Sequence, residues 1–598
     1  MATKFKQSSI KYTSRDFNSI RNDLIQHAKK YYADSFQDFN EASFGALMVD
    51  AVAYVGDMLS FYLDYQANES FLTTANEYNN IVKHGKALGY KMGSSPSSYG
   101  TVTLYVSVPA LSLGIGPDVS YAPTLRRGTT FSSTGGSTFM LINDVNFADP
   151  ANEITVSKMN SDGQATEFAI RAYGQVVSGK YNTQNFVIKD FEKYKRLDLG
   201  EPNLTEILSV FDSDGNEWFE VEHLSQNTVY RSITNAGANS TTVPNLLKPF
   251  IVMRRFTIER ELGRNYIQFG YGSEDNISYE GFLNPDDLVL ERHARDHITD
   301  LSFDPTKLIQ SDKFGLSPSN TTLRIAYRTN DRSTVNAGEG TVTSVRNSIF
   351  RFPESNSLNS STKSSIISSL EVINDEQIVG GVTYPSTDEV KRRIFDVFTS
   401  QNRAVTAQDY KALVYMIPAR FGSIKRCQIF QDPDAFKRNV NMYIVSENSN
   451  GNLIKTNSTI KNNLKNWLNQ YRMMNDTIDI LDGKIINVGI EFTLVAQAEN
   501  DKFSVLRRAE DVLRNEFLSV GEISDPISIG ELYRILNAIP GVSDTVDVRV
   551  VRKTGTRYSS YDFNVDDSMS FDGRYLLCPE DSIFEIKYLE ADIKGTVR

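Results

Sequence analysis

The chain has 598 residues, which is enough for roughly four domains of about 150 residues each. Hydrophobic residues make up 40% of it and charged residues 23%, a composition that excludes an intrinsically disordered chain. The net charge of -11 excludes a generally basic nucleic-acid-binding protein, because such a surface would repel a polyanion. The basic clusters are short, and we expect solvated edges or ion pairs there: Arg126-Arg127, Arg254-Arg255 and Lys391-Arg392-Arg393.

The cysteine count indicates whether the fold depends on disulfides or on a cysteine zinc site. Only Cys427 and Cys578 occur, so neither a disulfide framework nor a cysteine zinc cage can be built within one chain. The charged N-terminal residues are not followed by an apolar run, so no secretory signal is predicted. We therefore expect the protein to be made and kept in a cytoplasm.

Residues 1–92 are predicted to be helical. Thr13 or Ser14 can cap a first helix, and a third helix is expected from Thr74 to Leu88, ending at Gly89. The first helix has one apolar face, formed by Phe17, Ile20, Leu24 and Ala28.

The second predicted helix, residues 41–65, is apolar around most of its circumference. A surface helix normally carries a one-sided apolar stripe, so this helix needs neighbours on several sides. Asp50, Asp57 and Asp64 would be costly in a bilayer, and no transmembrane segment is predicted. We expect the helix to form an interface in an N-terminal bundle through Leu47, Val55, Met58, Leu59 and Tyr62.

The sequence pattern of residues 93–355 predicts a β-rich region, which we expect to form two domains. Short β-like runs such as Val102–Val108 and Tyr266–Phe269 are separated by Gly, Pro, Ser and Asn. The polar stretch Asn356–Ser365 is predicted to be a low-complexity loop at a domain boundary.

Helices and strands alternate in the remaining residues, which we divide into an α/β region at 366–480 and a C-terminal α/β region at 481–598. In the first, a helix is expected over Asp388–Thr399, and Thr406 with Asp409 resembles a capping box that opens another helix ending before Pro418. In the second, Ile486–Ala496 alternates as a long strand. Helices at 503–518 and 528–539 are expected to cover one face of a sheet that includes Val546–Val550. The fold class predicted for the whole chain is multidomain α+β.

A search for catalytic motifs finds no phosphate-binding loop, nucleophile elbow or zinc-binding HExxH helix. His293 and His297 could place two nitrogen ligands on one helix face, but they alternate with charges in a loop-like region, and exposed residues are favoured. Carboxylates are numerous, so a glycosidase pair stays open, yet no pattern selects one. The sequence therefore predicts no catalytic residues, no metal, no cofactor and no enzyme.

Two glycine-containing segments favour turns over ligand sites. Asp212–Glu217 resembles the start of a calcium loop, but position twelve is His223 in place of the bidentate Glu, so a hairpin turn is favoured. Gly270-Tyr-Gly272 and Gly114-Ile-Gly116 lack the third glycine of a dinucleotide site.

Several segments resemble the baseplate wedge proteins of contractile-tailed bacteriophages, in the baseplate J-like family. The N-terminal segments that carry the resemblance are Tyr12–Leu24, Phe39–Gly45, Ala53–Leu63, Ala67–Phe71 and Ala87–Tyr90. The second half is similar to the J-like domain through Asn374, Gly380-Gly381, the helix from Asp388, Arg403–Tyr410 and Ile539–Val542. The middle is matched loosely, through Arg126–Thr129 and Phe269–Gly272.

The resemblance implies a structural subunit of the inner baseplate ring around the central hub, located in the virion tail and assembled in the host cytoplasm. Family members pair as homodimers within each wedge, which implies that residues 481–598 are a dimerisation region. They close into a six-fold ring and contact other wedge proteins, including a small sheath-initiating subunit, through an N-terminal helical bundle. The ring transmits the change that triggers sheath contraction. No nucleic acid and no membrane insertion are implied. The resemblance also implies a structural motif made of Arg403, Thr406, Asp409 and Tyr410. In it Thr406 caps a helix and Tyr410 faces the core. The motif either stabilises the local helix or contacts a partner, and the first is at least as well supported as the second.

Two other classes remain as alternatives. A tail-associated cell-wall or polysaccharide hydrolase would need paired carboxylates or His/Cys clusters in one pocket. A receptor-binding tail protein would usually show repeats or trimeric β-structure, and no internal repeat is found.

Overall fold

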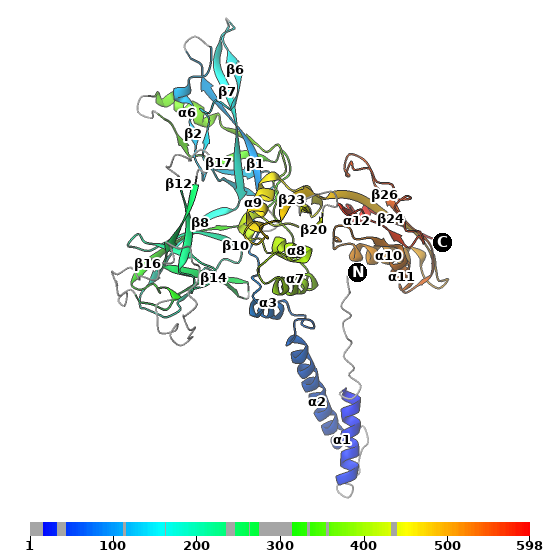
Figure 1. The fold of residues 1–598 in the computed structure, drawn as a ribbon. Coiled ribbons are helices and arrows are strands. Elements are labelled where there is room, and N and C mark those ends of the chain that lie inside the picture. The colour runs from blue at the N-terminus through cyan, green and yellow to red at the C-terminus, as the bar shows by residue number, and fades with distance from the viewer. Residues whose placement is uncertain are drawn as a thin grey trace. The chain divides into compact units, whose positions relative to one another are not determined.

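The computed structural model describes residues 16–32, 43–111, 115–161, 163–234, 245–261, 263–273, 314–331, 335–353, 358–431 and 439–598. Contacts divide the chain into two compact units, residues 1–92 with 384–402 and residues 93–383 with 403–598. An N-terminal helical segment precedes a β-rich body that contains both helices and strands (Figure 1). Some residues singled out in the sequence lie outside the described ranges: Thr13, Ser14, Gly114, His293, His297 and Asn356.

The first unit consists of helices. They are α1 (Phe17–Tyr31), α2 (Phe44–Glu69), α3 (Tyr78–Ala87) and α7 (Thr387–Ser400). Helix α1 contacts α2, and α3 contacts α7. The side-chain oxygens of Ser43 and Ser386 accept hydrogen bonds from the backbone N–H groups of Ala46 and Glu389, which fixes where α2 and α7 begin.

Two limits differ from the sequence prediction. Helix α2 continues four residues past the expected end, to Glu69, and α3 starts at Tyr78 rather than Thr74. The reason for the second difference is that Thr74 belongs to the turn after α2, where its hydroxyl donates to the carbonyl oxygen of Asn68 at 2.7 Å. A side chain bonded back to the preceding helix competes with continuation of the next one.

The end of α3 explains the segment Ala87–Tyr90. Gly89 has a φ of +87°, and the backbone N–H groups of Tyr90 and Gly89 donate to the carbonyl oxygens of Gly85 and Lys86 at 2.8 and 3.1 Å. This is a Schellman motif, in which the left-handed residue is normally glycine. Helix α7 approaches α3 closely, because a Cβ added at Gly85 would lie 2.8 Å from Cδ1 of Ile394.

The second unit begins with two large sheets. The first has the strand order β17-β3-β4-β7-β1-β19, with β6 also paired to β7. Its strands are β1 (Tyr99–Pro109), β3 (Thr130–Ser133), β4 (Thr138–Leu141), β6 (Glu153–Met159), β7 (Ala165–Ser178), β17 (Val342–Asn347) and β19 (Glu371–Ile373). The small sheet β18-β2-β5 consists of β18 (Phe350–Arg351), β2 (Thr124–Leu125) and β5 (Val145–Asn146). Apolar side chains of β1, β3, β4 and β7 form one buried core there.

The second sheet has the order β8-β16-β10-β11-β14-β15-β9 and its own core around Trp218 and Phe269. Its strands are β8 (Lys180–Ile188), β9 (Arg196–Asp198), β10 (Leu204–Phe211), β11 (Glu217–Glu220), β14 (Arg255–Glu261), β15 (Arg264–Phe269) and β16 (Thr321–Thr329), and a separate hairpin pairs β12 (Thr228–Thr234) with β13 (Asn245–Ile251). The Asp212 segment is the turn between β10 and β11, as expected. Gly215 has a φ of +83° in it, and the Asp212 carboxylate accepts from the backbone N–H groups of Asp214 and Asn216.

The prediction of a loop at 356–365 is wrong for residues 360–365, which the structure describes as helical. Ser360–Ser368 form helix α6, capped by the Asn359 side chain, which accepts from the backbone N–H of Ser361 at 3.0 Å. The helix contacts β1 and buries Ile366. Burial of a single isoleucine in the shared core, together with a good cap, outweighs the weak helix propensity of the serines.

The rest of the unit alternates helices with two four-stranded sheets. The first contains β20 (Arg426–Gln431), β21 (Asn439–Glu447), β22 (Leu453–Ile454) and β23 (Thr477–Asp482), with α8 (Ala407–Tyr415) and α9 (Ser458–Leu468). The second contains β24 (Lys484–Ala496), β26 (Val542–Arg552), β28 (Ser582–Glu585) and β29 (Ile593–Val597), with α10 (Lys502–Glu516), α11 (Ile529–Asn537) and α12 (Leu589–Asp592). A short pair joins β25 (Ile527–Ser528) to β27 (Tyr575–Leu576).

The long alternating strand expected at 486–496 is β24. Its alternate residues Ile486, Val488, Ile490, Phe492 and Leu494 are buried with side chains of α10 and α11 in one core. The two helices lie on the same side of this sheet (Figure 1), as the sequence pattern predicts for an α/β layer.

A candidate assembly surface on helix α2

Helix α1 covers the polar face of α2. Arg21 Nε donates to Asp50 Oδ1 at 2.5 Å, and a Cβ added at Gly56 would lie 3.2 Å from Cδ1 of Ile20. Apart from Gly45, the residues between Phe44 and Asp64 that are not exposed follow helical spacing on this same face: Ala46, Val49, Asp50, Ala53, Gly56, Asp57, Ser60 and Asp64. Small and acidic side chains therefore face α1, while the apolar side chains point elsewhere.

The opposite arc of α2 is apolar and exposed. At 100° per residue it spans roughly 200° of the helix circumference. The five interface residues expected from the sequence lie on it, with exposed fractions of 63% for Leu47, 55% for Val55, 36% for Met58, 58% for Leu59 and 58% for Tyr62. Seven further exposed apolar residues lie on the arc, and the sequence prediction did not assign them to the interface: Phe44, Met48, Val52, Tyr54, Phe61, Leu63 and Tyr65.

This exposed arc, Phe44–Tyr65 without the α1-facing residues, has a seven-residue repeat. One column is Met48, Val55 and Tyr62; a second is Ala51, Met58 and Tyr65; two flanking columns are Leu47, Tyr54 and Phe61, and Val52 and Leu59. A seven-residue apolar repeat favours a left-handed helical supercoil. Four adjacent apolar columns are wider than the two-column seam of a helix pair, so the arc can pack against more than one further helix.

Glu69, which the sequence analysis did not single out, joins α2 to α3. Its side chain is 6% exposed and accepts hydrogen bonds from the Asn76 backbone N–H at 2.8 Å, the Glu77 N–H at 3.3 Å and the Asn80 amide at 2.9 Å. Burial by itself would raise the pKa of this carboxyl, but these hydrogen bonds and the charge of Lys391 lower it. The junction thereby holds the C-terminal end of α2 on α3.

By length and composition α2 is also able to cross a membrane. An 18-residue window has a mean hydropathy of 1.4, and 11% of that window is buried. The sequence prediction of no transmembrane segment rested on Asp50, Asp57 and Asp64, and these three share the α1-facing side. The structure therefore offers two readings of α2, a helix that packs against other protein helices or one that enters a bilayer.

The second unit contains the motif Arg403, Thr406, Asp409 and Tyr410. Thr406 and Asp409 form a reciprocal capping box at the start of α8. Tyr410 is buried, and its hydroxyl donates to Asp476 Oδ2 at 2.8 Å, while Arg403 is exposed. Burial, followed by the Asp476 carboxylate, raises the pKa of Tyr410. The contacts of this motif are those of a local stabilising element.

Comparison with known protein families finds one match, to "Bacteriophage baseplate protein, N-terminal domain", over residues 16–87. The matched range contains α1, α2 and α3 and therefore the whole exposed arc. A search of curated protein sequences gave no match. The domain match supports a structural baseplate role.

Comparison with solved structures includes two baseplate assemblies. One is a chain of the anti-feeding prophage baseplate, with 9% identity and a TM-score of 0.27, covering 97% of this chain and 100% of that one. Another is a chain of the type VI secretion system TssK-TssF-TssG baseplate subcomplex, with 8% identity and a TM-score of 0.25, covering 72% of this chain and 96% of that one. TM-scores of this size do not establish a shared fold.

Proposed function

We propose that the chain is a structural subunit of a phage tail baseplate wedge, and that α2 joins it to other wedge chains in a multi-helix bundle. The observation that carries the proposal is the exposed apolar arc of α2, within the domain that is similar to baseplate N-terminal domains.

The free energy of burial supports association. A helix of this kind gains most of its stability from packing an apolar face, and burying one large apolar side chain contributes about 1.5–3 kcal/mol. The arc leaves a dozen such side chains exposed, and contiguous apolar surfaces of this size in soluble proteins mark interaction sites. Its four apolar columns fit a bundle of three or more helices better than a pair.

The finer parts of the proposal rest on the sequence resemblance. The subunit pairs as a homodimer within a wedge, takes part in a six-fold inner ring around the hub, and contacts other wedge proteins, including the small sheath-initiating subunit. Its C-terminal half contains the baseplate J-like domain. Its action is mechanical, in that reorientation of the ring triggers sheath contraction, and we assign it no catalytic residue, metal, cofactor or nucleic acid.

The test is a pull-down of co-expressed wedge proteins with the triple variant Leu47→Ser/Val55→Ser/Leu59→Ser. We expect the yield of complex to fall to background while the monomeric chain stays soluble, since these side chains are exposed in it. The matched control changes three exposed aliphatic residues outside α2, Ile115→Ser/Val187→Ser/Leu577→Ser, and should leave the yield unchanged. Undiminished complex from the α2 variant would overturn the proposal.

The membrane reading is the second candidate, favoured by the hydropathy of α2. Flotation of the purified chain with phosphatidylcholine vesicles separates the two readings. We expect no co-flotation, because the α1-facing side of α2 carries three carboxylates. Co-flotation that the same triple variant abolishes would favour the membrane reading instead.

A further inference from the structure

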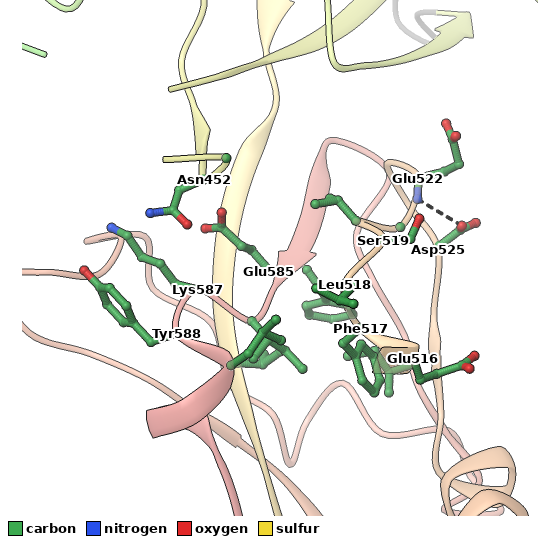
Figure 2. A pocket seen from close by; sticks show the side chains of 18 of the residues that line it. Asn452, Glu516, Phe517, Leu518, Ser519, Glu522, Asp525, Glu585, Lys587 and Tyr588 are labelled. Carbon is green, nitrogen blue, oxygen red and sulfur yellow. Dashed lines mark hydrogen bonds between the residues drawn. The ribbon is translucent and has the colours of Figure 1, made fainter. Parts of the chain in front are cut away.

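A cleft of about 930 Å³ lies in the second unit, against the last sheet (Figure 2). Its walls come mainly from the turn at Asn450–Asn452, from residues 516–535, which run from the end of α10 into α11, and from residues 584–591, which run from the end of β28 into α12. Apolar side chains form much of these walls, and Leu518 in one of them is 66% exposed. A concave apolar site with a few polar groups is typical of a binding site.

Part of the charge in the cleft is neutralised. Seven carboxylate side chains line it against three cationic ones, and three of the seven are in ion pairs, Glu447 with Lys425, Glu522 with Lys411 and Glu531 with Arg534. Glu516 and Glu590 are exposed and form no ion pair with any residue that the structure describes. Glu585 is 6% exposed, and its carboxylate accepts hydrogen bonds from the Leu453 N–H at 2.6 Å and the Asn487 amide at 2.7 Å. The exposed carboxylates of Glu516 and Glu590 can therefore pair with a cationic ligand.

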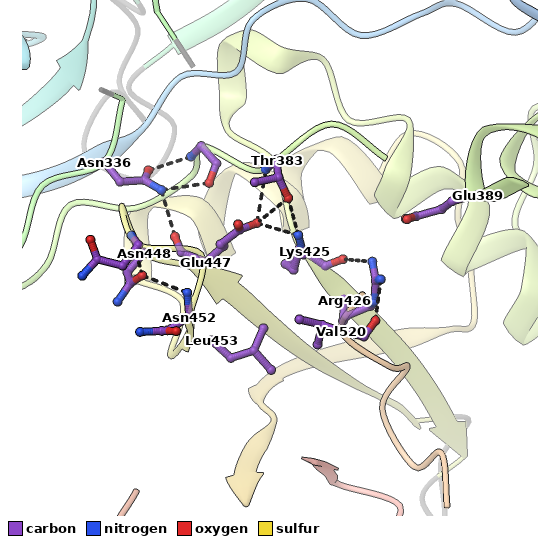
Figure 3. A network of polar contacts seen from close by, with 12 residues as sticks. Asn336, Thr383, Glu389, Lys425, Arg426, Glu447, Asn448, Asn452, Leu453 and Val520 are labelled. Carbon is purple, nitrogen blue, oxygen red and sulfur yellow. Dashed lines mark hydrogen bonds and ion pairs between the residues drawn. The ribbon is translucent and has the colours of Figure 1, made fainter. Parts of the chain in front are cut away.

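One side of the cleft is held by a polar network (Figure 3). Lys425 Nζ lies 2.8 Å from the Glu447 carboxylate, which also accepts from the N–H and hydroxyl of Thr383 at 3.2 Å each. Arg426 donates to the backbone carbonyl oxygens of Val520 and Gly521 at 2.8 and 3.0 Å. These contacts fix the 520–521 turn of the lining, so this part of the cleft is formed before a ligand arrives.

A segment of suitable chemistry occurs in the chain itself, outside the described residues. Residues 1–15 contain four cationic side chains and no carboxylate. The cations are interleaved with apolar residues, as Lys4-Phe5-Lys6 and Ile10-Lys11-Tyr12. Apolar residues of this kind match the apolar walls of the cleft, and the cations match the exposed carboxylates of Glu516 and Glu590.

We propose that this cleft binds residues 1–15 of a second copy of the chain. The choice of a second copy rests on the proposed function, in which several copies assemble. A contact of this segment with a cleft on another copy joins two different surfaces, so it is heterologous and can propagate around a ring. It is separate from the α2 surface, and either contact can be lost without the other.

The test measures binding of a fluorescent synthetic peptide of residues 1–15 to the chain lacking those residues, by anisotropy. We expect saturable binding that weakens by about tenfold or more in the Glu516→Lys/Glu590→Lys variant and weakens with added salt. The control Glu499→Lys/Asp566→Lys makes the same change of charge at exposed positions outside the cleft and should bind like the parent chain. A scrambled peptide of the same composition should bind much more weakly.

Three results would overturn the proposal. They are absence of binding, equal binding by the cleft and control variants, and equal binding of the scrambled peptide, because the last two show unspecific charge attraction.

Sedimentation velocity of the full chain tests the source of the segment. Self-association that depends on concentration, and that both the cleft variant and added peptide abolish, supports a second copy. If the full chain stays monomeric and does not bind the peptide, residues 1–15 of the same chain occupy the cleft. This result would overturn the assignment to a second copy. The α2 pull-down is independent of all these outcomes.

Discussion

Arg21 of α1 donates a hydrogen bond to Asp50 of α2 at 2.5 Å, so the contact between the two helices is made by the polar side of α2. Asp57 and Asp64 follow Asp50 at seven-residue intervals on the same side. Helix α1 thus lies on the carboxylate side of α2 and leaves the apolar arc outward. This orientation is the opposite of that in a helix hairpin that completes its own core, and it is the reason for assigning α2 to an interface.

Replacing Glu69 by Gln should destabilise the junction of α2 and α3. A neutral amide accepts the hydrogen bonds from Asn76, Glu77 and Asn80 less strongly, and we expect a loss of about 1–2 kcal/mol at pH 7. Because the folded-state pKa of Glu69 is lowered, its stabilisation is present above the unfolded pKa of about 4.3 and disappears as pH falls through the folded value.

The measurement is thermal unfolding of the Glu69→Gln variant and the parent chain from pH 7 to pH 3. The difference in Tm should shrink toward low pH, whereas Glu499→Gln, at an exposed position, should show no difference at any pH. A difference that stays constant or grows on acidification would contradict the role assigned to the charged carboxylate.

Gly270→Ala should destabilise the second sheet severely. A Cβ at this position would lie 2.2 Å from the backbone oxygen of Gly315 and 2.4 Å from that of Phe314, and backbone atoms cannot turn away as a flexible side chain can. We expect a cost on the order of 3 kcal/mol. Gly530→Ala is the control, because nothing lies within 4 Å of its added Cβ. Urea unfolding should show a lowered midpoint for the first variant alone, and similar midpoints for both would refute the close contact.

Tyr410→Phe should weaken the core beneath α8. The substitution removes the hydroxyl that donates to Asp476, whose side chain is then left buried with one partner fewer, at a cost of about 1–2 kcal/mol. Tyr575→Phe, at a position 44% exposed, serves as the control. Equal stability of the two variants in urea would show that the buried hydroxyl contributes nothing.

The chain should have no hydrolytic activity. The sequence shows no catalytic motif, and among the described residues no three His, Cys, Asp or Glu side chains are grouped to hold a metal. Incubation with peptidoglycan and capsular polysaccharide should release no soluble fragments. Reproducible turnover that one Asp or Glu substitution abolishes would refute the structural assignment.

Elements with strong periodicity were predictable from the sequence. Strand β24 follows from its alternation, and the start of α8 follows from the Thr406 and Asp409 pair, because both patterns act within a few residues. The polar helix α6 was missed, since its stability depends on Ile366 packing near β1, far away in sequence.

The candidate surface was predictable in part. The apolar residues around most of its circumference indicated that α2 needs neighbours, and five of its exposed residues were assigned to the interface on that basis. The apolar pattern did not indicate which side of α2 faces α1, because small and acidic residues form that contact. Glu69 and the close approach of Gly270 to Gly315 were equally hidden, because their partners lie in turns and chain segments that no local pattern connects.

The most direct test of the account is the reactivity of a thiol on the arc. A Leu59→Cys variant is labelled with maleimide, first as the isolated chain and then in assembled tails. The native thiols give little background at pH 7, because burial raises the pKa of Cys427 and of Cys578 to about 12. Glu499→Cys, outside α2, reports general accessibility. We expect Leu59→Cys to react rapidly in the isolated chain and to be protected in tails, while Glu499→Cys reacts in both. Equal labelling of Leu59→Cys in the two states would contradict it.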